Sequence, residues 1–357
     1  MNYRILLINP PIEDFYQTNI RQEPLGLEYL AAYLRAHKYN VRILDALNSD
    51  HKKTISLPQE LSYLKKYYPV GDISPFKLYG HYRHFGMDYG DIKKRILAFK
   101  PHCIGISANF TPYFDRALFT AKMCKNIYSD VPVIMGGHHV TAAPESALNS
   151  GYVDYVVLGE GEFTFQNLLN ILKNQKFKNL NSLSGIAFRN DDHIQINPVK
   201  EFIANLDELP APRNEKYFYS KMILTSRGCP RDCNFCSIKK VMGKRIRFRS
   251  IEAVIREITG AINSGITNID FEDDTLTFNR QHAIKLFSAL IEHFGKKDIT
   301  FSAQNGIDAN TLDEELINLM KAAGFRWLNL PLVSGSQHIQ NQLNRNQSRA
   351  RFQKVIE

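Results

Sequence analysis

Short apolar segments alternate with amphipathic helices along most of the chain, and this alternation sets its fold class. Continuous apolar runs occur at 4–9, 41–46, 103–108, 131–136 and 155–158. Between them, apolar residues recur at helical spacing in 26–37, 116–128 and 162–174. Strands without a polar face are typical of a parallel sheet that helices cover on both sides. We therefore predict a doubly wound, flavodoxin-like α/β domain of five strands over residues 1–180.

Residues 48–90 interrupt this alternation. The segment has no clear periodicity and is rich in Tyr and Phe. Long insertions in compact domains often act as lids or binding loops. A small helical decoration packed on the surface explains the same sequence equally well, so both alternatives stay open.

The alternation resumes after a connector at 181–214, which contains a predicted hairpin and then a linker stiffened by proline. Strands are predicted at 221–225, 266–271, 299–304 and 325–330, and helices at 251–264, 281–294 and 313–323. These are β/α barrel units, whose sites form at the carboxyl ends of the strands. Only four such strands precede Glu357. We therefore expect residues 215–357 to form a partial (β/α) barrel, either truncated after about four strands or unusually short, with truncation favoured.

Composition excludes several classes of protein. No apolar run reaches the roughly 18 residues of a membrane span, and the N-terminus lacks the features of a signal peptide, so we expect a cytoplasmic protein without a membrane span. The net charge of +9 comes mostly from scattered basic residues, and we expect no nucleic-acid partner. One exception is Lys239–Arg249, with six Lys or Arg among eleven residues. This segment is either a solvated loop or an anion-contacting segment.

Three of the five cysteines, Cys229, Cys233 and Cys236, lie within eight residues, just after the first predicted barrel strand. Clustered thiols in a chain without a secretory signal are typical of metal binding. A short glycine-containing loop can wrap three thiolates around a 4Fe–4S cluster and leave one iron open. A closed zinc site needs a fourth protein ligand, and the next histidine or cysteine downstream is His282. The spacing therefore favours the cluster over zinc.

The pattern Cys-x3-Cys-x-Phe-Cys after a barrel strand resembles the radical S-adenosylmethionine superfamily. The resemblance implies that the open iron chelates the methionine part of S-adenosylmethionine. It further implies that an electron from the reduced cluster cleaves this cofactor to a 5′-deoxyadenosyl radical. Phe235 matches the aromatic position that borders the adenine in that family.

The same resemblance assigns two further cofactor contacts. The acidic run Glu272–Asp274 matches a position that contacts the amino group or ribose, although an ordinary solvated strand end would look the same. Because side chains alternate along a strand, we expect Glu272, rather than Asp273, to reach the ammonium group. Ser334 and Gly335 match a loop after the fourth strand, but Val333 stands where many members have a polar residue.

The first half resembles the cobalamin-binding domains that are often joined to this barrel, through the segments PLGLEYLAAYL, GIS, MGGHH and YVVLGEGE. The resemblance implies that Ser107, Gly136 and Gly137 receive the nucleotide tail. It places the turn Gly159–Glu160–Gly161 near the corrin. Taken alone, these glycines are equally explained as tight turns between strands and helices. No Asp-x-His-x-x-Gly motif occurs, so we expect no lower axial histidine from that motif.

Together these features predict a cobalamin-dependent radical S-adenosylmethionine enzyme of the methyltransferase-like class. Its cofactors would be a 4Fe–4S cluster, S-adenosylmethionine and cobalamin. Its partners would be an electron donor, such as flavodoxin or ferredoxin, and a small-molecule or biosynthetic-intermediate substrate. The alternatives are a radical ring-forming or rearranging enzyme, a tRNA methylthiotransferase-like enzyme, and a non-catalytic corrinoid or iron–sulfur binding protein.

Overall fold

The computed structural model describes residues 3–16, 23–67, 81–213 and 220–357. The chain divides into two compact units, Met1–Lys200 and Glu201–Glu357. Each unit has its own hydrophobic core. None of the helices in these ranges combines the length and the apolar character that a membrane span requires.

A seven-stranded sheet forms the centre of the first unit, in the order β3-β1-β6-β7-β8-β9-β10. Its strands are β1 (Arg4–Asn9), β3 (Asn40–Asp45), β6 (Cys103–Ser107), β7 (Val133–Gly136), β8 (Tyr155–Val157), β9 (Ile186–Asn190) and β10 (His193–Asn197). The first five are parallel and follow the flavodoxin-like order that the sequence predicted. The hairpin β9–β10 pairs with β8 in antiparallel fashion. It therefore belongs to the first unit's sheet rather than to the linker.

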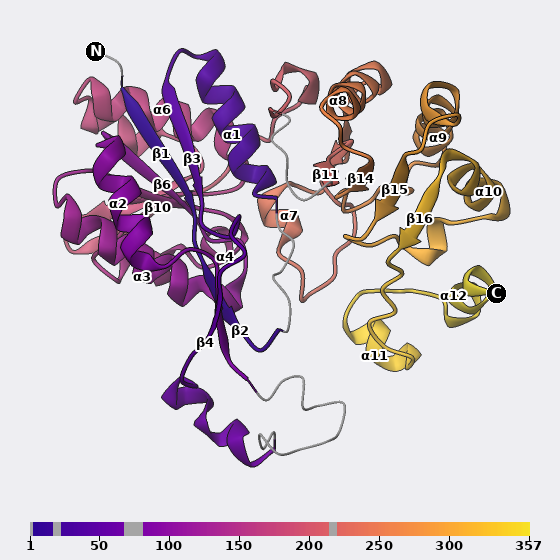
Figure 1. Ribbon diagram of the computed structural model, residues 1–357, viewed down its shortest axis with the longest axis horizontal. Helices are drawn as coiled ribbons and strands as arrows, with labels where there is room; N and C mark the ends of the chain where they lie inside the picture. The colour runs from indigo at the N-terminus through magenta and orange to yellow at the C-terminus, as the bar shows by residue number, and fades with distance from the viewer. Residues whose placement is uncertain (1–2, 17–22, 68–80, 214–219) are drawn as a thin grey trace. The chain divides into compact units, whose positions relative to one another are not determined.

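Helices cover both faces of this sheet (Figure 1). They are α1 (Leu25–Ala36), α2 (Tyr89–Phe99), α3 (Phe114–Ile127), the short α4 (His138–Ala142) and α5 (Pro144–Leu148), and α6 (Gly161–Lys173). Alternate residues of β1 enter different cores. Ile5 and Leu7 pack with residues of α1 and α6, whereas Leu6 and Ile8 pack with residues of α2 and α3. This two-sided burial explains why the strand is apolar at every position from Ile5 to Ile8.

The insertion at 48–90 contributes to a small antiparallel sheet with the order β2-β5-β4. Its strands are β2 (Ile12–Asp14), β4 (Lys52–Thr54) and β5 (Arg83–Phe85), and a 3-10 helix, η1 (Gln59–Lys66), follows β4. Residues 68–80 lie outside the described part of the chain. The described part of the insertion is thus a sheet together with a helix, and not a helical decoration alone.

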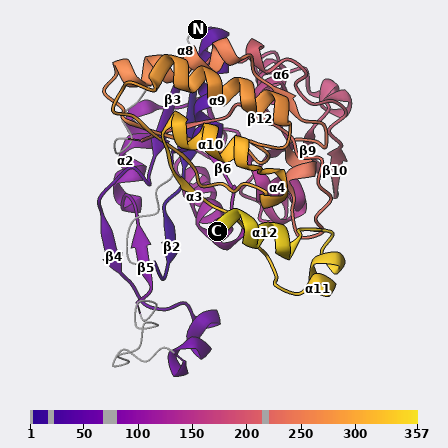
Figure 2. The same cartoon turned by 90° about the vertical axis from the view of Figure 1, so that its right-hand side faces the viewer.

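Four parallel strands form the main sheet of the second unit, in the order β11-β14-β15-β16. They are β11 (Ser220–Ile223), β14 (Asn268–Phe271), β15 (Thr300–Ala303) and β16 (Phe325–Leu328). Figure 2 shows helices α8 (Ile251–Asn263), α9 (Arg280–Phe294) and α10 (Glu314–Ala323) side by side. Phe271 and Phe301 pack into the core that these helices share with the sheet. These four predicted strands and three predicted helices are confirmed.

Shorter elements complete the second unit. They are β12 (Ser226–Arg227), β13 (Arg247–Phe248), α7 (Ile238–Val241), α11 (Gln337–Gln342) and α12 (Arg349–Ile356). Strands β12 and β13 pair in antiparallel fashion. The cysteine segment connects these two strands, so their pairing holds its two ends side by side.

Candidate functional site

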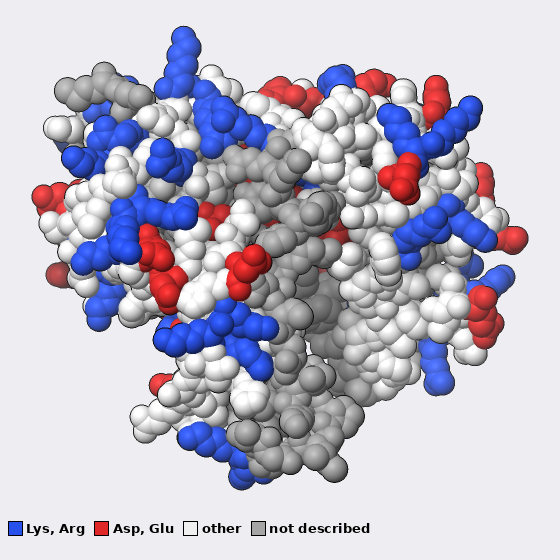
Figure 3. Space-filling model, in the orientation of Figure 1, with Lys and Arg blue, Asp and Glu red and all other residues white. Residues whose placement is uncertain are grey.

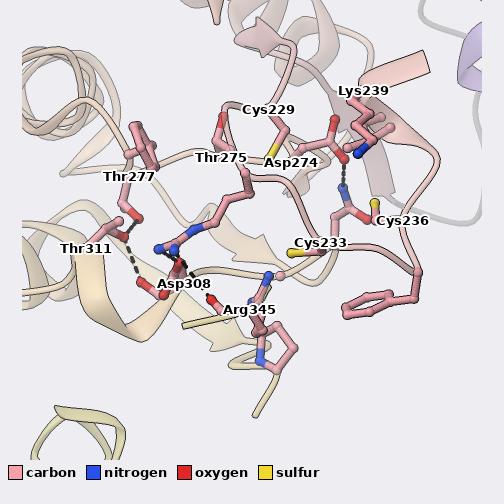
Figure 4. Close-up of a pocket in the computed structure, with 17 residues that line it drawn as sticks. Cys229, Cys233, Cys236, Lys239, Asp274, Thr275, Thr277, Asp308, Thr311 and Arg345 are labelled. Carbon is pink, nitrogen blue, oxygen red and sulfur yellow. Dashed lines mark hydrogen bonds and ion pairs between the residues drawn. The ribbon is translucent and has the colours of Figure 1, made fainter. Parts of the chain in front are cut away.

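The three clustered cysteines line a cavity of about 240 Å³ in the second unit. Figure 4 shows their side chains around a common space, together with Asp274 and Thr275. The other lining residues are Arg231, Phe235, Ile238, Lys239, Thr277, Phe278, Asn305, Gly306, Asp308, Thr311, Pro331 and Arg345. Most of them follow the carboxyl ends of β14, β15 and β16, which is where sites form in β/α proteins.

The first half of the cysteine loop depends on close backbone contacts. Gly228 has φ +100°, and a Cβ at this position would lie 2.3 Å from the carbonyl oxygen of Arg245. Only glycine fits both the backbone conformation and the space. The next residue, Cys229, donates its N–H to the carbonyl of Gly243 at 3.1 Å. The loop and the segment 243–245 are therefore in direct backbone contact.

The second half of the loop is anchored from the other side of the cavity. Asn234 donates its backbone N–H to Leu343 O at 3.2 Å and its side-chain amide to Gln342 O at 2.7 Å. Arg231 forms an ion pair with Asp308. These contacts hold the cysteines against segments more than seventy residues away in sequence.

Three cysteines without a fourth protein ligand suit a cluster with one open iron better than a closed zinc site. Thiolates on one zinc ion lie about 3.8 Å apart in tetrahedral geometry, whereas thiolates on a cubane bind different irons and lie farther apart. In the described residues, no three His, Cys, Asp or Glu side chains are close enough to share one metal ion. Burial raises the pKa of the Cys229 thiol, an effect that a hydrogen bond from the Arg231 backbone partly offsets. A bound cation would reverse this shift by stabilising the thiolate.

Only some of the residues predicted to contact S-adenosylmethionine lie at the cavity. Phe235 lines the cavity and is 56% exposed. Glu272 and Asp273 are not among the described residues that line it. Asp273 is 1% exposed and accepts hydrogen bonds from Thr225 and Ser226. The argument from strand alternation does not hold here, because β14 ends at Phe271 and the chain then turns.

Asp274 is the carboxylate of the acidic run that does line the cavity. Burial and the adjacent Asp273 raise its pKa to about 6. The side-chain amide of Asn305 approaches its Oδ1 at 3.5 Å (Figure 4). The acidic run could be recognised in the sequence. Which of its three carboxylates lines the cavity depends on the conformation of the turn after β14, which the sequence did not predict.

Ser334 and Gly335 lie outside the described lining of the cavity. The Ser334 hydroxyl accepts the N–H of Ser336 at 3.1 Å, and the Ser334 carbonyl accepts the side-chain amide of Gln340 at 2.6 Å. This segment therefore leads into α11. Of the residues after β16, Pro331 and Arg345 line the cavity. Thr277, Thr311 and Asp308 also line it, and no sequence motif pointed to them.

The first unit has a smaller cavity, of about 50 Å³, at the carboxyl ends of β1 and β6. Ser107 lines it and is paired with Gly136 across β6 and β7. Gly137 has φ +121°, and a Cβ there would lie 2.8 Å from the backbone of Ala108. Close packing alone therefore requires Gly137, whatever else it contacts.

The turn Gly159–Glu160–Gly161 lies between β8 and α6 and is not among the described residues lining that cavity. Gly159 has φ +68°, and Glu160 is buried. Among the nearby imidazoles, His139 has one ring nitrogen 3.0 Å from the Thr111 hydroxyl and the other 3.2 Å from the Ser146 hydroxyl. Both ring nitrogens of His139 thus have hydroxyl partners in this structure.

Two family models match the chain: the B12 binding domain over residues 82–169 and the radical SAM superfamily over residues 223–357. An uncharacterized methyltransferase of Pyrococcus horikoshii is 32% identical over 94% of this chain and 66% of its own length. The cytidylyl-2-hydroxyethylphosphonate methyltransferase of Streptomyces wedmorensis is 27% identical over 95% of this chain and 67% of its own length. The chain thus spans about two thirds of the length of these relatives.

Solved structures agree in fold. The cobalamin-dependent S-adenosylmethionine radical enzyme OxsB superposes with a TM-score of 0.73 at 18% identity, over 98% of this chain and 46% of that one. The radical S-adenosylmethionine methyltransferase TsrM of Kitasatospora setae gives 0.70 at 17% identity, over 94% and 60%. With both family models matched in order along one chain, this protein belongs to the radical S-adenosylmethionine proteins that carry a B12-binding domain.

Proposed function

We propose that this chain forms the cofactor-binding part of a cobalamin-dependent radical S-adenosylmethionine methyltransferase. When bound, the cluster would supply the electron that cleaves S-adenosylmethionine, and cobalamin would carry the methyl group. The observation that carries the proposal is the convergence of Cys229, Cys233 and Cys236 on one cavity. The four-stranded sheet beneath them would be part of a β/α barrel of the family's kind.

Each group at the cavity has a role that its chemistry suits. The three thiolates would hold the cluster, and Phe235 would border the adenine. Asp274, rather than Glu272 or Asp273, would accept a hydrogen bond from the ammonium group of S-adenosylmethionine, because it is the carboxylate of the acidic run that lines the cavity. A charge-assisted hydrogen bond of this kind contributes roughly 1.5–3 kcal/mol. Ser334 and Gly335 would matter only indirectly, through the segment that leads away from Pro331.

In the first unit, Ser107, Gly136 and Gly137 would line the path of the cobalamin tail, and the turn Gly159–Gly161 would lie near the corrin. Support comes from their shared position at the carboxyl edge of a flavodoxin-like sheet. Because no Asp-x-His-x-x-Gly motif occurs, we propose a lower cobalt face without histidine coordination.

Anaerobic reconstitution of the full chain tests the cluster. We expect about four irons and four sulfides per chain, and Cys229→Ala, Cys233→Ala and Cys236→Ala should each abolish them. Cys103→Ala is the control, because that thiol is fully buried in the first unit. With reductant, the wild type should form 5′-deoxyadenosine from S-adenosylmethionine. Normal cluster content in all three variants would rule out the assignment, and a cluster without cleavage would leave a non-catalytic iron–sulfur protein.

Cobalamin binding is tested by absorption and EPR spectra of the same protein. We expect spectra without nitrogen coordination at the lower face. His138 is the neighbouring imidazole to check, because burial lowers its pKa and keeps it neutral. A histidine-ligated spectrum that disappears in His138→Ala would overturn the proposed lower face. Absence of binding would remove cobalamin from the proposal.

A further inference from the structure

A second cavity of the second unit has no part in the proposed chemistry. It measures about 370 Å³, a size typical of small-molecule pockets, which hold roughly 300–1,000 Å³. None of the described residues that line it also lines the cysteine cavity. On the face in Figure 3, by contrast, the Lys and Arg side chains of the described residues are spread over both units, with acidic side chains among them. A cavity therefore marks a possible ligand site more clearly than surface charge does.

Two segments form the walls of this cavity. One is a face of α8, on which Ala253, Arg256, Glu257 and Gly260 recur at the spacing of a single helical stripe. The other is the segment 209–212, with the sequence Leu-Pro-Ala-Pro. Small residues at 253 and 260 leave space on the helix, and the two prolines restrict the backbone of the facing segment. The cavity is therefore formed before any ligand binds.

One carboxylate at the cavity has an unused hydrogen-bond acceptor. The side chain of Glu257 is 1% exposed, and its Oε2 forms an ion pair with Arg249 at 2.6 Å. Its other oxygen, Oε1, is buried and has no hydrogen-bond partner among the described residues. The second carboxylate, Asp207, already accepts the N–H of Ser250 with both oxygens, at 3.0 and 3.1 Å. Because buried acceptors are nearly always satisfied, Glu257 Oε1 is suited to accept a ligand's N–H group.

The two arginines at the cavity differ in what they contact. Arg249 is buried, and its guanidinium also donates to Leu224 O at 2.9 Å. It therefore holds the Glu257 carboxylate in place. Arg256 is exposed and forms no ion pair among the described residues. Its guanidinium is therefore available to an anionic group of a ligand.

We propose that this cavity binds a free α-amino acid with an apolar side chain. The ammonium group donates to Glu257 Oε1, the carboxylate pairs with Arg256, and the side chain packs against Leu209 and the two prolines. Simpler ligands fit less well, because Glu257 repels a lone anion and the two arginines repel a lone cation. A zwitterion satisfies both groups at once. This binding does not require the cluster, S-adenosylmethionine or cobalamin.

Isothermal titration calorimetry of the full chain tests the site. The probes are L-leucine, L-valine and L-phenylalanine, and we expect binding both with and without the reconstituted cluster. Glycine, which lacks the apolar side chain, should bind at least about tenfold more weakly than L-leucine. So should N-acetyl-L-leucine, which lacks the ammonium group. Failure of all three apolar amino acids to bind at millimolar concentration would overturn the proposal.

Arg256→Gln tests the contact to the carboxylate at an exposed position, where the substitution is compatible with the fold. It should weaken L-leucine binding by about tenfold or more. The weaker binding of L-leucinamide, which has no carboxylate, should not change further. The matched control is Lys285→Gln, which removes the same charge from an exposed position of α9 and should bind L-leucine as the wild type does. Equal affinities for L-leucine in Arg256→Gln and the wild type would contradict the site, and so would equal losses in both variants.

Ala253→Leu tests the location, because it fills the cavity from the side of α8 without changing a charge. It should abolish L-leucine binding while the circular dichroism spectrum stays that of the wild type. L-leucine that binds only the cluster-loaded chain and is displaced by S-adenosylmethionine would lie at the cysteine cavity and overturn the assignment. A tripeptide ending in leucine that binds more tightly than L-leucine would overturn it too, by showing a site for peptide ends.

Discussion

Asp274 shows how a site residue can weaken the fold that carries it. Its pKa of about 6 in the folded chain exceeds the ordinary value of 3.8, because burial and Asp273 disfavour its charge. The unfolded chain therefore loses this proton at lower pH than the folded chain. Stability falls as pH rises from about 4 to 6, and the full cost is present above that range.

Asp274→Asn should consequently stabilise the cluster-free protein at pH 7.5, by up to about 3 kcal/mol, and the gain should shrink below pH 6. The same change should weaken S-adenosylmethionine binding to the cluster-loaded protein by roughly 10–150-fold. Urea unfolding and anaerobic equilibrium binding measure the two effects. Glu272→Gln is the control and should bind normally. The opposite result, with Glu272→Gln impaired and Asp274→Asn normal, would restore the assignment based on strand alternation.

Gly228 is a second residue that the cysteine loop requires, because there is no room for a side chain at its position. Gly228→Ala would place a methyl group 2.3 Å from the Arg245 carbonyl on a backbone with φ +100°, so the cysteine loop must move. We expect iron content after reconstitution to fall by half or more. Gly335→Ala is the control, because nothing lies within 4 Å of a Cβ there. Full iron content in Gly228→Ala would show that the loop tolerates the shift.

At the scale of elements, a buried polar cluster joins the small sheet to the first unit's helical layer. Glu13 of β2 contacts His84 of β5 at 3.5 Å and Arg116 of α3 at 3.0 Å. The hydrogen bond that the His84 ring donates to the Glu13 carboxylate raises the pKa of His84 above 6.5. Burial raises the pKa of Glu13, but His84 and Arg116 more than offset this, so that it lies below 4.5.

The contribution of His84 is therefore complete below pH 6.5 and is lost as pH rises through its folded pKa, whereas that of Glu13 is lost on acidification below 4.5. We expect His84→Ala to destabilise β2 and β5 more at pH 5.5 than at pH 8.5, because the pKa of His84 is raised in the folded chain. Hydrogen exchange of these strands in increasing urea measures the difference. Equal costs for His84→Ala would contradict the pairing.

At the scale of the whole molecule, separate cores predict separate unfolding. The two units share no hydrophobic cluster among the described residues, and multi-domain chains commonly unfold in more than one step. In calorimetry, cobalamin at a hundred times its Kd should raise the first unit's transition by about 5–10 °C and leave the second unchanged. Cobinamide, which lacks the nucleotide tail, should raise it less. Equal shifts of both transitions would show that the units unfold together.

Prediction from the sequence succeeded where a residue pattern is compatible with only one structure. The middle of β1, from Ile5 to Ile8, is apolar without a break because helices cover both of its sides. The cysteine spacing pointed to one cavity because three ligands within eight residues cannot lie far apart. Prediction from the sequence was insufficient at Glu272–Asp274. The strand ends before this run, so the alternation of side chains along a strand no longer tells which way each one points. The hairpin at Ile186–Asn197 was visible as a hairpin, but its own residues did not reveal which sheet edge it would join.

The sequence by itself determined the layered α/β class, the succession of strands and helices along the chain, and the cysteine trio, because these depend on local periodicity and short spacing. Only the tertiary structure decided how the strands pair and which carboxylate of the acidic run lines the cavity. It also decided that residues 242–245 and 342–345 would clamp the cysteine loop. Those outcomes depend on contacts between residues far apart in the chain, and such contacts form only when the strands and turns have taken their places around a common core.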